Sequence, residues 1–193
     1  QKAVSAPPGL TFVVVSDDAK EKMRNRKTPI ASFYANLKAF DGYYEKKWFP
    51  YTMPISDIYG LRAAFNLIAG DETLYERHAR IGSATRAAVK EAGLKLHLQS
   101  GYSNTVMVFD IPECTDAKSI LDEMRTKYNI MLAGSFDELS GKVIRIGHMG
   151  ENARLEHMVP ALEALSATLT DLGVKLQGNL ADLFLKHYRE FKG

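Results

Sequence analysis

One arginine stands out among the residues that could do chemistry, because it interrupts an apolar segment. Arg145 lies in the segment 143–147, and strand alternation places its side chain on the same face as Val143 and Gly147. A guanidinium among apolar neighbours needs an anionic partner, since burying it unpaired is costly. That partner is either a carboxylate of this chain or the carboxylate of a ligand. The segment alone leaves both readings open.

The histidines and the single cysteine suggest less. The five histidines form no pair at the i, i+4 spacing of a helical metal site, and no metal is predicted. His148 is the most informative of them, because Gly147 and Gly150 flank it and would allow a ligand to approach the backbone. The alternative is a histidine in a tight bend. Cys114 cannot form an internal disulfide, and a packed or solvent-exposed thiol is favoured over a reactive one.

Composition excludes several classes of protein. The 193 residues carry 25 Lys+Arg against 23 Asp+Glu, which disfavours a strongly basic nucleic-acid binder, and the basic cluster 20–27 spreads its charges around a short helix. No apolar run approaches the roughly 20 residues that cross a bilayer, so no membrane segment is expected. The lone cysteine favours a reducing, cytoplasmic setting.

The N-terminal part of the chain predicts one buried strand followed by helices. Residues 10–15 form a β-branched apolar run without polar alternation, which is typical of a strand buried on both faces. Ser16 and the acidic residues after it predict a helix to about residue 26. The aromatic-rich stretch 32–47 is predicted to be helical, and two prolines break the loop 48–54.

The remainder predicts two long helices and then an α/β unit. Apolar spacing predicts helices over 56–70 and 71–92, the second ended by Gly93. Asp116 is predicted to cap a further helix, and two more helices end the chain. Four segments have strand character, at 94–98, 105–109, 143–146 and, less clearly, 129–132.

The context of Lys2 carries a family resemblance. Lys2 alone would be a solvated side chain, but Gln1-Lys2-Ala3-Val4-Ser5-Ala6-Pro7-Pro8-Gly9 resembles the segment of class V, fold-type I aminotransferases in which a lysine holds pyridoxal 5'-phosphate. Alanine–glyoxylate and serine–pyruvate aminotransferases are the members it resembles most. Further matching segments follow in the same order, at 27–28, 32–34, 51–54, 58–62 and 141–150.

The resemblance implies an architecture and a set of roles. It implies an α/β fold in which 1–70 ends the large cofactor domain, 71–93 is a connecting helix, and 94–193 is a small domain with a mainly antiparallel sheet of three or four strands. Lys2 would form the Schiff base with pyridoxal phosphate, Arg145 would bind the substrate carboxylate, and Thr52 would contact the cofactor phosphate of the neighbouring subunit. The implied protein is a homodimer that transfers an amino group between a small amino acid and a 2-oxo acid such as glyoxylate or pyruvate.

Two positions depart from the family pattern. In the aminotransferases that the chain resembles, a residue with an aromatic hydroxyl lies three positions before the threonine that corresponds to Thr52. This chain has Phe49 at that position, and Tyr51 is not the aligned residue. The stretch 132–135 lacks the double glycine usual before the carboxylate-binding arginine. One phosphate contact and the substrate preference are therefore less transferable.

The family places several cofactor contacts upstream of the lysine, so we expect a preceding segment and an inactive isolated fragment. One alternative is a non-catalytic folding and dimerisation domain. Another is a different class V enzyme, such as a lyase or desulfurase. The desulfurases share a His-Lys pair and a mobile-loop cysteine, whereas here Gln1 precedes Lys2 and Cys114 lies elsewhere.

Overall fold

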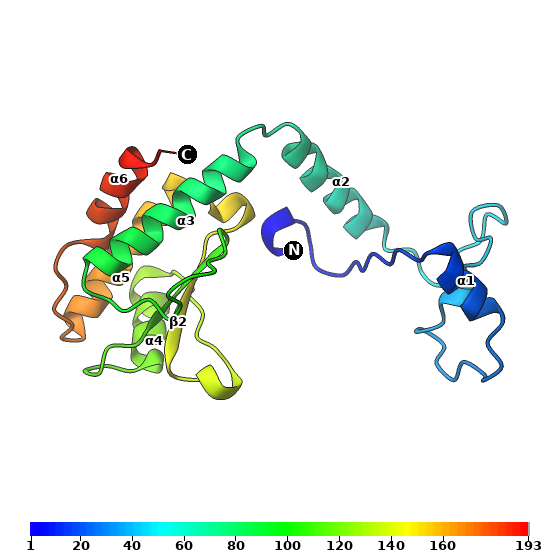
Figure 1. The fold of residues 1–193 in the computed structure, drawn as a ribbon, viewed down its shortest axis with the longest axis horizontal. Coiled ribbons are helices and arrows are strands. Elements are labelled where there is room, and N and C mark those ends of the chain that lie inside the picture. Colours follow the sequence, from blue (N-terminus) through cyan, green and yellow to red (C-terminus); the bar gives the residue numbers. More distant parts are fainter. Residues whose placement is uncertain (193) are drawn as a thin grey trace. The chain divides into compact units, whose positions relative to one another are not determined.

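A computed structural model describes residues 1–192 of the chain and divides it into two compact units. The first unit is Ala6–Phe65, and the second combines Gln1–Ser5 with Asn66–Gly193. The regular elements, shown in Figure 1, are α1 (Asp17–Arg24), α2 (Ile55–Ala69), α3 (Leu74–Glu91), β1 (Val106–Asp110), α4 (Ala117–Tyr128), β2 (Val143–Gly147), α5 (Leu155–Asp171) and α6 (Leu180–Glu190).

The first unit contains α1 and most of α2, where the sequence predicted helices. Ser16 begins α1 by accepting a hydrogen bond from the Ala19 amide over 3.2 Å, which satisfies one of the free N–H groups of the first turn. The Pro-Gly turn packs directly on α2, because a Cβ on Gly60 would lie 2.8 Å from Cγ of Pro7. Gly60 thus allows this close approach of turn and helix.

The prediction of a buried strand at residues 10–15 is wrong for this structure. The segment has no strand partner within residues 1–192, and Phe12, Val13 and Val14 are 69%, 55% and 98% exposed. An interior strand of a parallel sheet needs hydrogen-bonding neighbours at both edges and layers over both faces. The described part of the first unit provides neither, so the run stays extended and open.

The predicted helix at 32–47 is also wrong. Only a short 3-10 turn, Leu37–Phe40, forms there, and bends and turns make up the rest. Asn36 caps the turn, and Gly42 and Lys47 adopt positive φ angles of 69° and 53°. These left-handed positions end a helix, so the aromatic side chains gather through turns instead.

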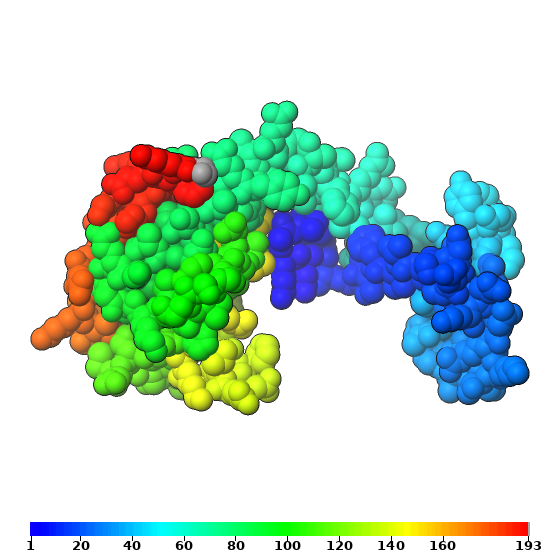
Figure 2. Space-filling view, viewed as in Figure 1, coloured from blue at the N-terminus to red at the C-terminus, as the bar shows by residue number. Residues whose placement is uncertain are grey.

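The second unit has a hydrophobic core between three helices and a small sheet. α6 packs against both α3 and α5, and its atoms, red in the space-filling view, lie directly beside those of α3 (Figure 2). Ile81 of α3, Leu165 of α5 and Phe184 of α6 are at most 1% exposed. α4 packs on α5, which completes the helical cover of the core.

The sheet is antiparallel as expected, but the predicted count of three or four strands is wrong. Within residues 1–192 it has two strands, β1 and β2, with Val108 opposite Arg145 in the register. The candidate segment 94–98 contacts this pair at a single bridge, Leu96 with Phe109, and Ala133, one residue beyond the candidate segment 129–132, forms another with Arg145. One bridge on each side is too short a pairing to extend the ladder into a regular strand.

The helix ends follow the sequence closely. Asp116 accepts a 2.9 Å hydrogen bond from the Ser119 amide at the start of α4, as predicted. Gly93, with φ of 88°, follows α3, which lies inside the predicted helix at 71–92. The division into domains at 70 and 93 stays a prediction.

None of the helices in residues 1–192 is long and apolar enough to cross a membrane.

Candidate functional site

Arg145 is held at the centre of β2 by backbone pairing on both edges. β1 lies on one side, and on the other Arg145 donates its amide to the Ala133 carbonyl over 2.7 Å. Its strand neighbours Ile144 and Ile146 are buried in the core, at 0% and 3% exposure. The apolar strand therefore fixes the arginine backbone, while its side chain is only partly buried.

The Arg145 side chain has a neutral partner and no carboxylate. Its Nε donates to the Gly134 carbonyl over 2.6 Å, and its guanidinium carbon lies 5.7 Å from the centre of the Phe136 ring. None of the ion pairs found within residues 1–192 includes Arg145. A structural salt bridge, one of the two readings of the sequence, is therefore absent there. The terminal nitrogens keep the fork geometry that suits a carboxylate.

Lys2 begins a 3-10 turn, Lys2–Val4, in an uncommon backbone conformation. Both Lys2 and Ser5 have φ of 58°, in the left-handed region that non-glycine residues seldom adopt. The turn closes through a 2.9 Å hydrogen bond from the Ser5 amide to the Lys2 carbonyl. Lys2 is exposed, and no ion pair within residues 1–192 includes it. Such strained positions concentrate at functional sites.

The segment that follows β2 supports the Lys2 turn. The Glu151 amide donates a 3.0 Å hydrogen bond to Ser5 Oγ. A Cβ on Gly150 would lie 2.1 Å from that Oγ and 3.0 Å from the carbonyl oxygens of Lys2 and Ala3, so only glycine fits there. Gly147 ends β2 three residues earlier. One short segment thus joins the Arg145 strand to the Lys2 turn.

His148, in the same segment, is a packed side chain. It is fully buried, and both of its ring nitrogens lack a hydrogen-bond partner. Burial lowers the pKa of His148 to about 4, because the charged ring would be desolvated. Of the two readings of the sequence, this favours a histidine in a tight bend. No group of three or more His, Cys, Asp or Glu side chains within residues 1–192 is placed to hold a metal ion.

The buried His148 predicts acid sensitivity of the fold. Its pKa is lower in the folded state, so the unfolded chain binds more protons between about pH 6.5 and 4 and stability falls as the pH falls through that window. We expect the free energy of unfolding to drop by about 3 kcal/mol across it. Urea unfolding at several pH values measures the drop. His148→Leu should flatten the profile, whereas His157→Gln, at an exposed position, should not. Equal profiles for wild type and His148→Leu would contradict the assignment.

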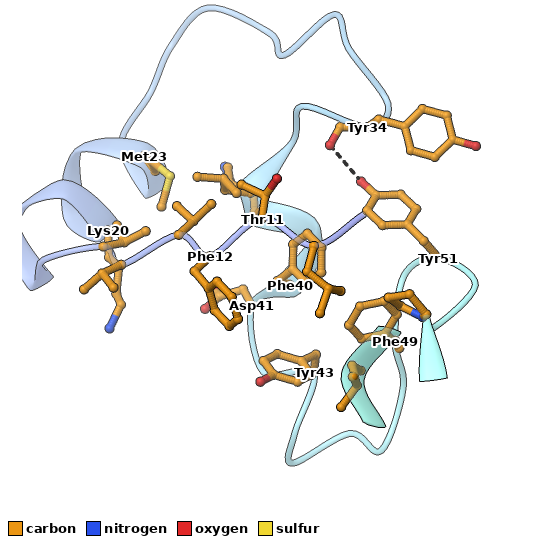
Figure 3. A pocket seen from close by; sticks show the side chains of 18 of the residues that line it. Thr11, Phe12, Lys20, Met23, Tyr34, Phe40, Asp41, Tyr43, Phe49 and Tyr51 are labelled. Atoms are coloured by element: carbon orange, nitrogen blue, oxygen red, sulfur yellow. Dashed lines mark hydrogen bonds between the residues drawn. The ribbon is translucent and has the colours of Figure 1, made fainter. Parts of the chain in front are cut away.

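Thr52 lies in the first unit, beside a hollow of about 1140 Å³. Aromatic rings line this hollow, and Figure 3 shows Phe40, Phe49 and Tyr51 gathered around it. Tyr51 donates its hydroxyl to the Phe33 carbonyl over 2.6 Å. The Phe49 ring packs edge to face on Phe40, with centres 5.5 Å apart. The Tyr51 hydroxyl is therefore already bonded to a backbone carbonyl, and Phe49 contributes a packed ring without a hydroxyl.

Comparison with known proteins places this geometry in a family. No protein-family model matches the chain. Serine–glyoxylate aminotransferase of Arabidopsis thaliana is 36% identical over 90% of the chain and 44% of its own length. The crystal structure of ureidoglycine–glyoxylate aminotransferase from Bacillus subtilis superposes with a TM-score of 0.89 at 30% identity, over 97% of this chain and 50% of that one. Pyridoxamine–pyruvate aminotransferase from Mesorhizobium loti gives 0.85 at 32% identity, over 97% and 50%.

The chain belongs to the class V aminotransferases. It spans about half the length of the relatives it matches and corresponds to the C-terminal half of such an aminotransferase. The family resemblance is therefore confirmed, as is the α/β fold class of an aminotransferase C-terminal domain. The roles of Lys2, Thr52 and Arg145 in this chain stay predictions.

Reasoning from the sequence missed the residues that support the Lys2 turn. His78 of α3 is 8% exposed and accepts a 3.0 Å hydrogen bond from the Gly150 amide. One signal was available, because His78 falls between Leu74 and Ile81 at spacings of four and three on the apolar face of α3. Nothing in the sequence paired that helix position with Gly150.

Proposed function

We propose that the whole protein is a pyridoxal-phosphate-dependent aminotransferase that moves an amino group between a small amino acid and a 2-oxo acid such as glyoxylate or pyruvate. The relatives named above are aminotransferases of glyoxylate or pyruvate. The observation that carries the proposal is the Arg145 guanidinium, which is centred on a strand and has no ion-pair partner within residues 1–192. Both substrate classes carry the carboxylate that such a fork binds.

The residues of the second unit fit the proposed cofactor. Pyridoxal phosphate, when bound, supplies an aldehyde for amine exchange and a conjugated ring that stabilises negative charge at the substrate Cα. The chain offers Lys2, an exposed primary amine, for the aldehyde. The left-handed backbone of Lys2, held by Ser5 and Gly150, restricts the direction in which the Lys2 side chain leaves the backbone. The donor chemistry therefore suits an amine-linked cofactor.

Each site residue then has a defined task. Lys2 would hold the cofactor before the substrate arrives, and its amine, once free, would act as the base for the proton at the substrate Cα. Arg145 grips the substrate carboxylate with two parallel N–H bonds and so sets which bond at Cα is aligned for cleavage. Gly134, through its carbonyl, and Phe136, through its ring, limit the directions open to the Arg145 side chain.

The first unit would complete the site in a homodimer. We propose that Thr52 of the partner subunit donates its hydroxyl to the cofactor phosphate, with 1–70 serving as the end of the cofactor domain. Phe49 cannot add a second hydroxyl there, which predicts one phosphate contact fewer than in the look-alikes. Cys114 is exposed and unpaired by disulfide, which suits the reducing cytoplasm as the proposed setting.

A half-reaction experiment tests the reaction class. The natural full-length protein, loaded with pyridoxal phosphate, is mixed with alanine or serine and its visible absorbance is followed. We expect the yellow colour to fade and to return when glyoxylate or pyruvate is added, with glycine or alanine as the product. Ethylamine, a substrate-sized amine without a carboxylate, is the matched control and should leave the colour nearly unchanged. Release of ammonia from serine without recovery of the colour by a 2-oxo acid would instead indicate a lyase. Release of sulfur from added cysteine would indicate a desulfurase.

A further inference from the structure

A buried histidine faces the segment that supports the Lys2 turn. His78 Nδ1 lies 2.7 Å from the Leu74 carbonyl of its own helix, an acceptor, so this nitrogen carries the proton. The other nitrogen, Nε2, is then a lone-pair acceptor and receives the Gly150 amide over 3.0 Å. The helix carbonyl thus selects the tautomer that can bind Gly150.

From Gly150 the contact passes directly to the turn. Gly150 itself has φ of 59°. Its Cα lies so close to the turn that a side chain on it would collide with Ser5 Oγ and the Lys2 carbonyl oxygen. The next amide, that of Glu151, donates to Ser5 Oγ. The Ser5 amide closes the turn on the Lys2 carbonyl. Three consecutive hydrogen bonds and one steric fit therefore connect α3 to the backbone of Lys2.

We propose that His78 is a positioning residue for Lys2, acting through the Gly150 amide. This inference rests on the proposed function for the meaning of Lys2, although the hydrogen-bond chain itself does not. The left-handed conformation of Lys2 and Ser5 costs free energy that the chain recovers only while Gly150 is held in place. Without the His78 acceptor, the buried Gly150 amide would lose its partner and the turn would lose its support.

The test compares three variants in the full chain. His78→Leu removes the acceptor, and His78→Gln places a side-chain oxygen that can still accept from Gly150. Thr85→Val is the matched control, because Thr85 is another buried polar residue of α3, and its side-chain hydrogen bond within residues 1–192 goes to the Ile81 carbonyl. Amide hydrogen exchange is read at Ser5, Gly150 and Glu151 by NMR.

His78→Leu should speed exchange at these three amides by about tenfold relative to the rest of the unit, as expected for the loss of one hydrogen bond to a buried group. His78→Gln should restore most of the protection, and Thr85→Val should leave the three amides unchanged relative to the unit. Unchanged exchange in His78→Leu, or an equal loss in Thr85→Val, would overturn the proposal. If His78→Leu does not fold, Ser5→Ala serves instead, with faster exchange expected at Glu151 and Ser5.

A second readout links the turn to the amine. Borohydride trapping of pyridoxal phosphate on Lys2 should be about tenfold slower in His78→Leu than in wild type and should recover in His78→Gln, if the lost hydrogen bond is carried through to the amine. No trapping on Lys2 in the wild type would reject the proposed function while the exchange data still decide the role of His78. The variants could differ in amide exchange as expected and still trap pyridoxal phosphate at equal rates. That result would show that His78 supports the turn but does not position the amine, and it would reject the inference.

Discussion

Lys2→Ala in the full-length enzyme is expected to lower kcat by about 10³-fold or more and to abolish the yellow absorbance of the loaded protein. In the proposed function the amine is needed twice, once to hold the cofactor and once to carry the Cα proton, and no solvent molecule would replace both roles. Steady-state transamination of alanine with glyoxylate, together with an absorbance spectrum, measures the loss.

Two companion variants make the Lys2 result specific. Lys2→Arg keeps the positive charge but cannot form the imine, so it should be as inactive as Lys2→Ala. Lys175→Ala removes an exposed lysine elsewhere in the same unit and should retain full activity. A Lys2→Ala protein that kept its colour would show that another amine holds the cofactor.

Arg145→Gln is the second large effect that we expect. Removing one partner of a charged, bidentate contact typically costs about 3–5 kcal/mol, which corresponds to a loss of about two to four orders of magnitude in kcat/KM for the amino acid. Arg145→Lys keeps the charge without the planar fork and should recover only part of the loss.

The measurement separates binding from folding. Arg125→Gln, which breaks an exposed ion pair with Asp122, is the control and should leave kcat/KM unchanged. Thermal unfolding of Arg145→Gln should resemble the wild type, since the Arg145 side chain makes one hydrogen bond within residues 1–192, to the Gly134 carbonyl. A large loss of stability with unchanged kcat/KM would instead identify Arg145 as a structural residue.

Local signals in the sequence predicted the helices of the second unit well. Asp116 and Gly93 mark helix ends through capping chemistry that depends on neighbouring residues only, and the structure has both. The run at 10–15 failed for the opposite reason. Its apolar pattern indicates a strand buried on both faces, yet such a strand exists only when other segments pair with it, and no local pattern provides them.

The candidate site was predictable only in part. The position of Arg145 in an apolar strand raised the question of an anion, but the pattern could not exclude an internal carboxylate; the contacts of the side chain could. Lys2 was recognised from a family resemblance alone. The sequence could not indicate His78, because its partner, the Gly150 amide, is 72 residues away in the chain. A backbone amide is present in every residue except proline, so no residue type marks it as a partner.

Gly134 and Gly150, which lie on either side of the Arg145 strand in the sequence, differ in the side chains they could accept, and this bears on redesign of the protein. A Cβ on Gly134 would meet only Leu121 Cδ1, at an ordinary 3.5 Å, whereas one on Gly150 would collide with the Lys2 turn. Variation aimed at new substrates can therefore be concentrated at 134–136, next to the guanidinium. Gly150 is better kept constant, because a side chain there would collide with the turn that carries Lys2, the proposed catalytic amine.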